Sequence, residues 1–194
     1  GFFTLVAVIL FVQGTRTVRE VERRQRSGLQ ATENFLKASP LPTKNHISQS
    51  PEDAERAAQE EEWTQAAEAI LTVCAPQPHK FALYDGLTHD HLLWGVARVE
   101  ESAPPGTAGN TVIYGHRDSS FRCLKDIQIG DTVTVTTQES EWTYRERTEI
   151  CSPEAPAITQ PYDTPHLTLV TCYPFTYSGP ALERFLVICS TDSP

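Results

Sequence analysis

A cysteine ends an apolar run near the C-terminus, and it is the first residue in the sequence that could carry covalent chemistry. Residues 167–171 are mostly apolar or β-branched, which is typical of a half-buried strand. Side chains alternate along a strand, so Thr168, Val170 and Cys172 are expected on one face. Pro174 cannot donate to a sheet ladder, so the strand should end just past Cys172, where a substrate could reach the thiol.

Two other apolar runs place polar residues that would complement a thiol. His116 follows residues 111–115, and Arg184 begins residues 184–188. Taken singly, each has an ordinary interpretation, because lone cysteines are often core residues and arginines often snorkel at edges. Together, Cys172, His116 and Arg184 supply a nucleophile, a proton carrier and an oxyanion stabiliser.

The chemistry of these three side chains assigns their roles. The thiolate of Cys172 would be the nucleophile, and His116 would protonate the departing amine as general acid. Ordinary thiols and imidazoles differ by about 2 pKa units, so only about 1% of molecules would hold the thiolate with the imidazolium. This predicts slow turnover. Arg184 is permanently charged and suits the oxyanion role.

Two neighbouring residues have open interpretations. Thr171 is a candidate substrate-binding residue through its hydroxyl or backbone, although a β-branched residue is also ordinary in a strand. Asp118 could orient His116, but Arg117 beside it favours a simple ion pair in the turn.

The motifs resemble those of the sortase family. Residues 168–172 read Thr-Leu-Val-Thr-Cys, which is similar to the TLxTC signature, and Gly115-His116 and Arg184 follow in the family's order. The runs Gly-His-Arg-Asp with Phe121, and Thr-Cys-Tyr-Pro-Phe, look most like sortases of Gram-negative bacteria. The resemblance covers about residues 79–192.

The resemblance implies a mainly β fold, a closed barrel of about eight strands. It also implies a cysteine transpeptidase that cleaves a C-terminal Leu-Pro-x-Thr-Gly-like sorting signal between Thr and Gly. An acyl-enzyme on Cys172 would then pass to an amine acceptor at the cell envelope. The partner would be a protein carrying that signal, and no cofactor is expected.

Two alternatives stay open. A thiol hydrolase would form the same acyl-enzyme and resolve it with water. A membrane-anchored binding barrel would have the fold without catalysis, and its Cys172 would react with electrophiles no faster than Cys74 or Cys123.

Composition excludes several classes of function. The chain has 194 residues and a formal net charge of −9, which argues against a nucleic-acid partner. It has no Walker loop, no GxGxxG motif and no paired CxxC, so neither a nucleotide nor a structural zinc is expected. The sequence contains 5 cysteines. With Cys172 free, the other four allow three pairings or none, and no spacing singles out a disulfide.

The N-terminal residues predict an attachment to a membrane. Residues 1–12 are almost wholly apolar, and twelve helical residues span about 18 Å of a ~30 Å hydrocarbon core. We interpret residues 1–16 as the end of a signal anchor, with a cleaved signal peptide as the alternative. This predicts attachment to the inner membrane, with the catalytic domain facing the periplasm or exterior. The arginines that follow, from Arg16 to Arg26, favour the opposite orientation.

The remaining chain divides into a stalk and a catalytic domain. Residues 17–74 are expected to be a helical stalk and linker: a charged helix over 17–37, a linker over 38–50, and a helix beginning at Ser50 whose apolar face runs from Trp63 to Leu71. Residues 75–194 are expected to form the barrel, with short strands that include 81–84, 91–99 and 132–136.

Overall fold

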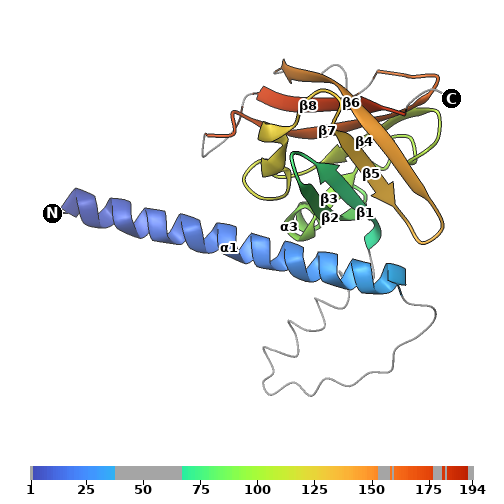
Figure 1. Ribbon diagram of the computed structural model, residues 1–194. Helices are drawn as coiled ribbons and strands as arrows, with labels where there is room; N and C mark the ends of the chain where they lie inside the picture. The colour runs from blue at the N-terminus through green and yellow to red at the C-terminus, as the bar shows by residue number, and fades with distance from the viewer. Residues whose placement is uncertain are drawn as a thin grey trace, which may run out of the picture.

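A closed β-barrel with one long helix along its side forms the protein (Figure 1). The computed structural model describes residues 2–37, 67–152, 158, 160–176, 181 and 183–191, with side chains from Val18 in the first range and up to Glu146 in the second. The predicted linker over 38–50, and the predicted helix from Ser50 as far as residue 66, lie outside the described residues.

The barrel order joins strands that are distant in sequence. Around the barrel the strands follow the order β1-β2-β3-β4-β7-β8-β6-β5. β2 pairs with β3, and β4 with β7, in parallel, and the other neighbours are antiparallel. The strands are β1 (Ala67–Cys74), β2 (Pro78–Asp85), β3 (Val96–Arg98), β4 (Gly109–Tyr114), β5 (Thr132–Thr136), β6 (Glu141–Ser152), β7 (Pro165–Tyr173) and β8 (Glu183–Ser190). The predicted mainly β, closed barrel is therefore confirmed.

Alternating apolar side chains fill the barrel interior. Each of the eight strands contributes to one buried cluster, which includes Leu71 of β1, Val133 and Val135 of β5, Leu169 of β7 and Val187 of β8. The 3₁₀ helix η1 (Ser120–Asp126), expected as a short helix over 121–127, adds buried side chains to the same cluster. The valines of the predicted strand over 132–136 do share a buried face.

A second apolar cluster covers the outer wall of the barrel beside β7 and β8. It contains Val112, Val170, Leu186 and Ile188. Alternation sets Leu186 and Ile188 on the same face of the strand as Arg184, and their apolar side chains predict that this face lies in the barrel core, which is wrong. Their strand neighbours point into the interior, so these two residues point outward and are buried on the wall instead. The face of β8 that begins with Arg184 is therefore an outer face.

The helix expected from Ser50 does not reach Leu71. Residues 67–74 form β1, which pairs with β2 on one side and β5 on the other. The expectation of a helical face through Ala67, Ile70 and Leu71 is therefore wrong. Pairing with two strands overrides the helix preference of an alanine-rich segment. Residues 67–74, expected in the stalk, are part of the barrel.

The strand expected over residues 91–99 is also largely wrong. His89–Trp94 form the short helix α3, and only Val96–Arg98 form a strand, β3. Thr88 caps α3, since its side chain accepts a hydrogen bond from the backbone N–H of His91 at 3.1 Å. Short apolar runs do not distinguish a buried helical turn from a strand.

The long helix α1 (Phe2–Lys37) contains the predicted helix over 17–37 and packs against β1, β2 and α3. Its N-terminal part projects past the barrel (Figure 1). Gly28 permits the close approach, because a Cβ there would lie 2.9 Å from the Tyr84 hydroxyl and 3.1 Å from the Trp94 carbonyl oxygen. Within the described part of the chain, no helix has both the length and the apolar character needed to cross a membrane.

Candidate active site

Strand register brings Cys172 and Arg184 together. β7 and β8 are antiparallel, and Cys172 of β7 lies directly opposite Arg184 of β8. Side chains of paired residues project from the same face of a sheet, about 4.5–5.5 Å apart at Cβ. Both residues are half-buried. Cys172 continues the face of Thr168 and Val170, as predicted, and that face is the outer wall of the barrel.

His116 reaches the same place from the neighbouring parallel strand. Tyr114 of β4 pairs with Val170 of β7, and the next amide, that of Gly115, donates to the Val170 carbonyl at 3.1 Å. His116 lies two residues after Tyr114, and Cys172 two residues after Val170, so the parallel register carries both to the same ends of the two strands. The structure thus brings together the three residues that the sequence singled out as nucleophile, acid and oxyanion stabiliser.

The turn that carries His116 is held by backbone and side-chain contacts. The His116 carbonyl accepts from the backbone N–H of Phe121 at 2.8 Å, which folds the chain back onto η1. Gly115 has no room for a side chain, because a Cβ there would lie 2.6 Å from the Phe121 ring. The hydroxyl of Thr171 donates to the Gly115 carbonyl at 2.7 Å, tying β7 to this turn.

The buried position of Thr171 gives it a structural contact. The residue is 2% exposed, and its hydroxyl lies on the face opposite Cys172. Its side chain therefore positions Gly115 and, with it, the start of the turn that bears His116. A direct contact between Thr171 and a substrate stays a prediction.

Burial and two neighbours act on the imidazole of His116. Burial lowers the pKa of His116, the Asp118 carboxylate raises it, and the nearby His89 lowers it further. The net effect is a lowered pKa, which favours the neutral imidazole. Asp118 therefore acts on His116 electrostatically. Arg117, which the sequence favoured as a partner of Asp118, donates from its guanidinium to the Pro174 carbonyl at 3.4 Å.

The guanidinium of Arg184 is oriented by backbone carbonyls at the start of its own strand. One of its nitrogens donates to the carbonyls of Ala181 at 3.1 Å and Glu183 at 3.0 Å. The Arg184 cation also acts on Tyr114, whose pKa is raised by burial and lowered in part by Arg184. Tyr114 is therefore a neighbour of the site that the sequence did not indicate, since nothing in a strand sequence reports which cross-strand residues meet.

The other described cysteines occupy different environments. Cys74, Cys123 and Cys172 are free thiols, Cys189 is fully buried, and the side chain of Cys151 lies outside the described residues. Burial raises the pKa of Cys123 to about 12. That thiol is poorly suited to nucleophilic chemistry, because the thiolate is the reactive form. Cys172 differs in lying half-buried at a strand end beside an imidazole and a guanidinium.

Two of the other described histidines make structural contacts. His91 Nδ1 contacts the Gly86 carbonyl, and the His166 ring stacks on Tyr162 with centroids 3.7 Å apart. Among the described side chains, no group of three or more His, Cys, Asp or Glu residues could hold a metal ion.

A closed eight-stranded barrel with a cysteine, a histidine and an arginine at adjoining strand ends defines a class of protein. The model of the sortase domain matches residues 71–192 of the chain, and the chain belongs to the sortase family. Sortases are cysteine transpeptidases that act on protein substrates carrying sorting signals.

Individual relatives share the fold at low sequence identity. Sortase D of Bacillus subtilis (strain 168) is 33% identical over 107 residues, which are 54% of this chain and 54% of that protein, so the chain spans about half the length of this curated relative. The sortase D5 transpeptidase of Clostridium perfringens superimposes with a TM-score of 0.63 at 20% identity, covering 88% of this chain and 99% of that one. Sortase C of Streptococcus pneumoniae gives 0.60 at 19% identity, covering 91% and 90%.

Proposed function

We propose that this protein is a cysteine transpeptidase that cleaves a C-terminal sorting signal of the Leu-Pro-x-Thr-Gly type between Thr and Gly. The observation that supports it most is the register of β7 and β8, which sets Cys172 opposite Arg184 while β4 delivers His116 beside them. Family membership supports the same activity.

The reaction would proceed in two steps through an acyl-enzyme. The Cys172 thiolate attacks the threonine carbonyl carbon, and a sulfur–carbon bond forms while Arg184 donates to the developing oxyanion. The carbon–nitrogen bond breaks, and His116 gives its proton to the departing glycine amine. An amine acceptor at the cell envelope then attacks the thioester, an amide bond forms, and the thiol is released.

The outer wall beside the site suits the apolar part of such a signal. Val170 lies two residues before Cys172 on β7, and Leu186 lies two residues after Arg184 on β8. These two residues pair with each other on the same face of the sheet as Cys172 and Arg184. Val170 and Leu186 are fully buried, and the half-buried Tyr114 and Ile158 pack against this cluster. The exposed parts of these two side chains would hold a leucine-proline segment and leave the threonine carbonyl over Cys172.

Analysis of the products tests the proposal. A Leu-Pro-x-Thr-Gly peptide incubated with the full chain and an added primary amine should yield the peptide amide of that amine. Without the amine, slow hydrolysis should remain. A thiol hydrolase would give the free carboxylate in both cases, and a silent binding barrel would give neither product and no selective labelling of Cys172.

The peptide-cleavage rate should have a bell-shaped dependence on pH, since the reaction needs the Cys172 thiolate and the His116 imidazolium together. Ordinary thiols titrate about 2 units above imidazoles, so below the His116 pKa the imidazolium is saturated while the thiolate still falls. The acid limb of the pH–rate profile therefore reports the pKa of His116. Because burial lowers its pKa, this limb should lie below 6.5, the ordinary value.

The measurement is the peptide-cleavage rate across pH, with His116→Gln as comparison. The variant should lose most activity at every pH. A wild-type rate that climbs through about pH 9, past the ordinary thiol range, and then stays level would show that His116 is not the acid.

We propose further that the chain is a sortase of the Gram-negative type. The two motifs that suggest it touch in the fold, because Arg117 of the Gly-His-Arg-Asp run donates to Pro174 of the Thr-Cys-Tyr-Pro-Phe run at 3.4 Å. Phe121, the other marker, packs against Gly115. Recovery of this gene from a Gram-positive genome would contradict the assignment.

We also propose that the N-terminal residues anchor the protein in the inner membrane, with the barrel on the outer side. The apolar residues 1–12 and the continuity of α1 from Phe2 into the barrel-docked segment support it. Protease added to intact spheroplasts should digest residues 79–192 of the full-length protein. Digestion that occurs only after lysis would reverse the proposed orientation.

A further inference from the structure

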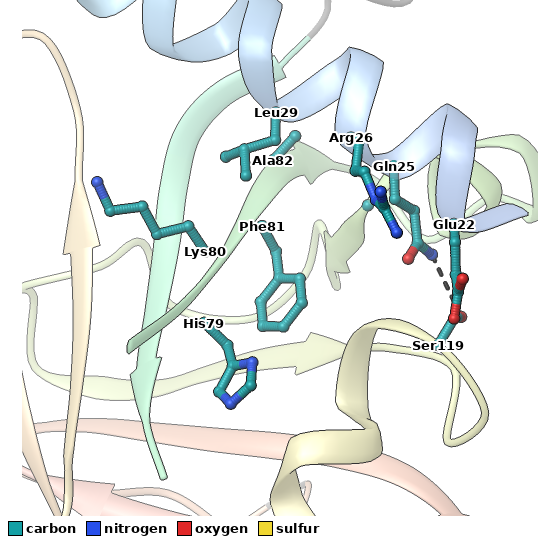
Figure 2. Close-up of a pocket in the computed structure, with 10 residues that line it drawn as sticks. Glu22, Gln25, Arg26, Leu29, His79, Lys80, Phe81, Ala82 and Ser119 are labelled. Carbon is teal, nitrogen blue, oxygen red and sulfur yellow. Dashed lines mark hydrogen bonds between the residues drawn. The ribbon is translucent and has the colours of Figure 1, made fainter. Parts of the chain in front are cut away.

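The helix α1 contacts the turn that carries His116 through one side chain. The carboxamide nitrogen of Gln25 lies 3.3 Å from the Ser119 hydroxyl, 3.3 Å from the Ser120 hydroxyl and 3.4 Å from the Leu92 carbonyl. An amide nitrogen has two hydrogens, so the three acceptors share them. Figure 2 shows Gln25 reaching from α1 toward Ser119 at one end of a cavity of about 290 Å³ between the helix and β2.

The two serines belong to the turn that leads from His116 into η1. The amide of Ser119 donates to the His116 carbonyl at 3.4 Å, and the Ser120 hydroxyl donates to the Gly95 carbonyl at 3.2 Å. Ser120 is 1% exposed and is held by the Gly95 carbonyl, which lies between α3 and β3. The Ser119 side chain makes no capping bond to η1, so its contact with Gln25 is available to hold the turn from outside.

The same helix face covers one side of His116. Val18 and Val21 line a small cavity of about 110 Å³ together with His116, Asp118 and Ser119. Val18, Val21 and Gln25 follow the i, i+3, i+7 spacing of a single helix face. Further along, Gly28 lies close against Tyr84 and Trp94, which fixes the distance between α1 and the barrel.

We propose that Gln25 is a positioning residue for His116: it docks α1 on the turn and thereby sets the distance and the solvent cover of the imidazole. This inference rests on the proposed transpeptidase function. Positioning matters because a displacement of about 1 Å far from the chemistry can cost on the order of 10²-fold in rate.

The charged and titratable groups near the imidazole come from several elements, which include Cys172 at the end of β7 and Arg184 at the start of β8. Asp118 lies on the same turn and His89 begins α3, and both act on His116 electrostatically. The α1 residues that line the cavity of about 110 Å³ beside the imidazole are Val18 and Val21. Glu22 of α1 lines the cavity of about 290 Å³, which Ser119 also lines. If the helix contact loosens, water reaches His116, and its lowered pKa should rise toward the ordinary value.

The test compares Gln25→Ala with Gln30→Ala in the full chain. Gln30 is an exposed glutamine of the same helix whose amide nitrogen donates to the Asn34 side-chain oxygen at 3.3 Å, so it is a matched control for side-chain type and helix propensity. Gln25→Ala should lower kcat about tenfold and change KM less than about twofold, as expected for misplacement of the acid rather than loss of binding. An NMR titration should show a raised His116 pKa. Gln30→Ala should change neither, and equal behaviour of the two variants would overturn the proposal.

A second variant keeps the test decisive if Gln25→Ala destabilises the protein. Ser119→Ala removes only the hydroxyl that Gln25 contacts. If the contact carries the effect, the double variant should lose no more than Gln25→Ala alone. If the two substitutions lowered the rate by factors that multiply in the double variant, the result would contradict the proposal. Should the wild-type chain cleave no peptide, the proposed function fails, and the histidine titration still decides whether Gln25 controls the environment of His116.

Discussion

Replacing Cys172 with alanine is expected to abolish cleavage of a Leu-Pro-x-Thr-Gly peptide while the barrel stays folded. The thiol supplies the sulfur atom that forms the covalent bond, and Cys172 lies opposite Arg184 in the strand register. The residue is half-buried on the outer wall at the end of β7, outside the interior cluster. Truncation there should cost less than the 2–5 kcal/mol or so of a core deletion.

Cleavage rates and melting curves should be measured side by side, with Cys74→Ala as the matched control. Cys74 is a half-buried free thiol that ends β1, so it matches Cys172 in exposure and in its place at a strand end. The control should keep normal rates. Retained cleavage in a folded Cys172→Ala variant would end the thiol mechanism.

Replacing Arg184 with lysine is expected to lower the cleavage rate on the order of 10²-fold or more, as for losing one oxyanion donor. The guanidinium is fixed by its bonds to the carbonyls of Ala181 and Glu183, and it lies across the strand pair from Cys172. A planar fork held in this way keeps further N–H groups for a substrate carbonyl, whereas an ammonium acts as a point charge. Arg184→Ala should be at least as severe.

The control for this pair is Arg122→Lys, an exposed arginine on η1. Melting temperatures of the Arg184 variants should change little, since the residue is half-buried and its guanidinium bonds to the carbonyls of Ala181 and Glu183, close to it in sequence. Near-normal rates in the lysine variant would show that catalysis does not need two hydrogen bonds from the guanidinium. Near-normal rates in the alanine variant would make Arg184 an ordinary edge residue.

Much of the barrel could be predicted from the sequence, because strand alternation is a local signal; the catalytic roles of Cys172, His116 and Arg184 stay predictions. The valines of β5 and the cysteine face of β7 lie as alternation predicts. Which face of β8 points into the barrel could not be predicted from the sequence. Leu186 and Val187 are both fully buried, although Leu186 lies on the outer wall and Val187 in the interior. Alternation divides a strand into two faces without saying which one is the interior.

The misassigned segments and the missed residues have a common physical cause. β1 became a strand because β2 and β5 flank it, and β5 is distant from it in sequence. Gln25 contacts Ser119 across 94 positions of the chain. A polar residue on a charged helix carries no local sign of such a contact, so only the fold reveals it.

The central claim is that Cys172 carries an acyl-enzyme, and mass spectrometry of the trapped intermediate tests it most directly. The full chain is mixed with a Leu-Pro-x-Thr-Gly peptide without an amine, quenched in acid and digested. We predict that the fragment containing Cys172 gains the mass of the peptide acyl group ending at threonine. We also predict that the adduct disappears when an amine is added, and that it is absent from Cys172→Ala. Peptide cleavage without an adduct, or with the acyl group on another residue, would contradict the account.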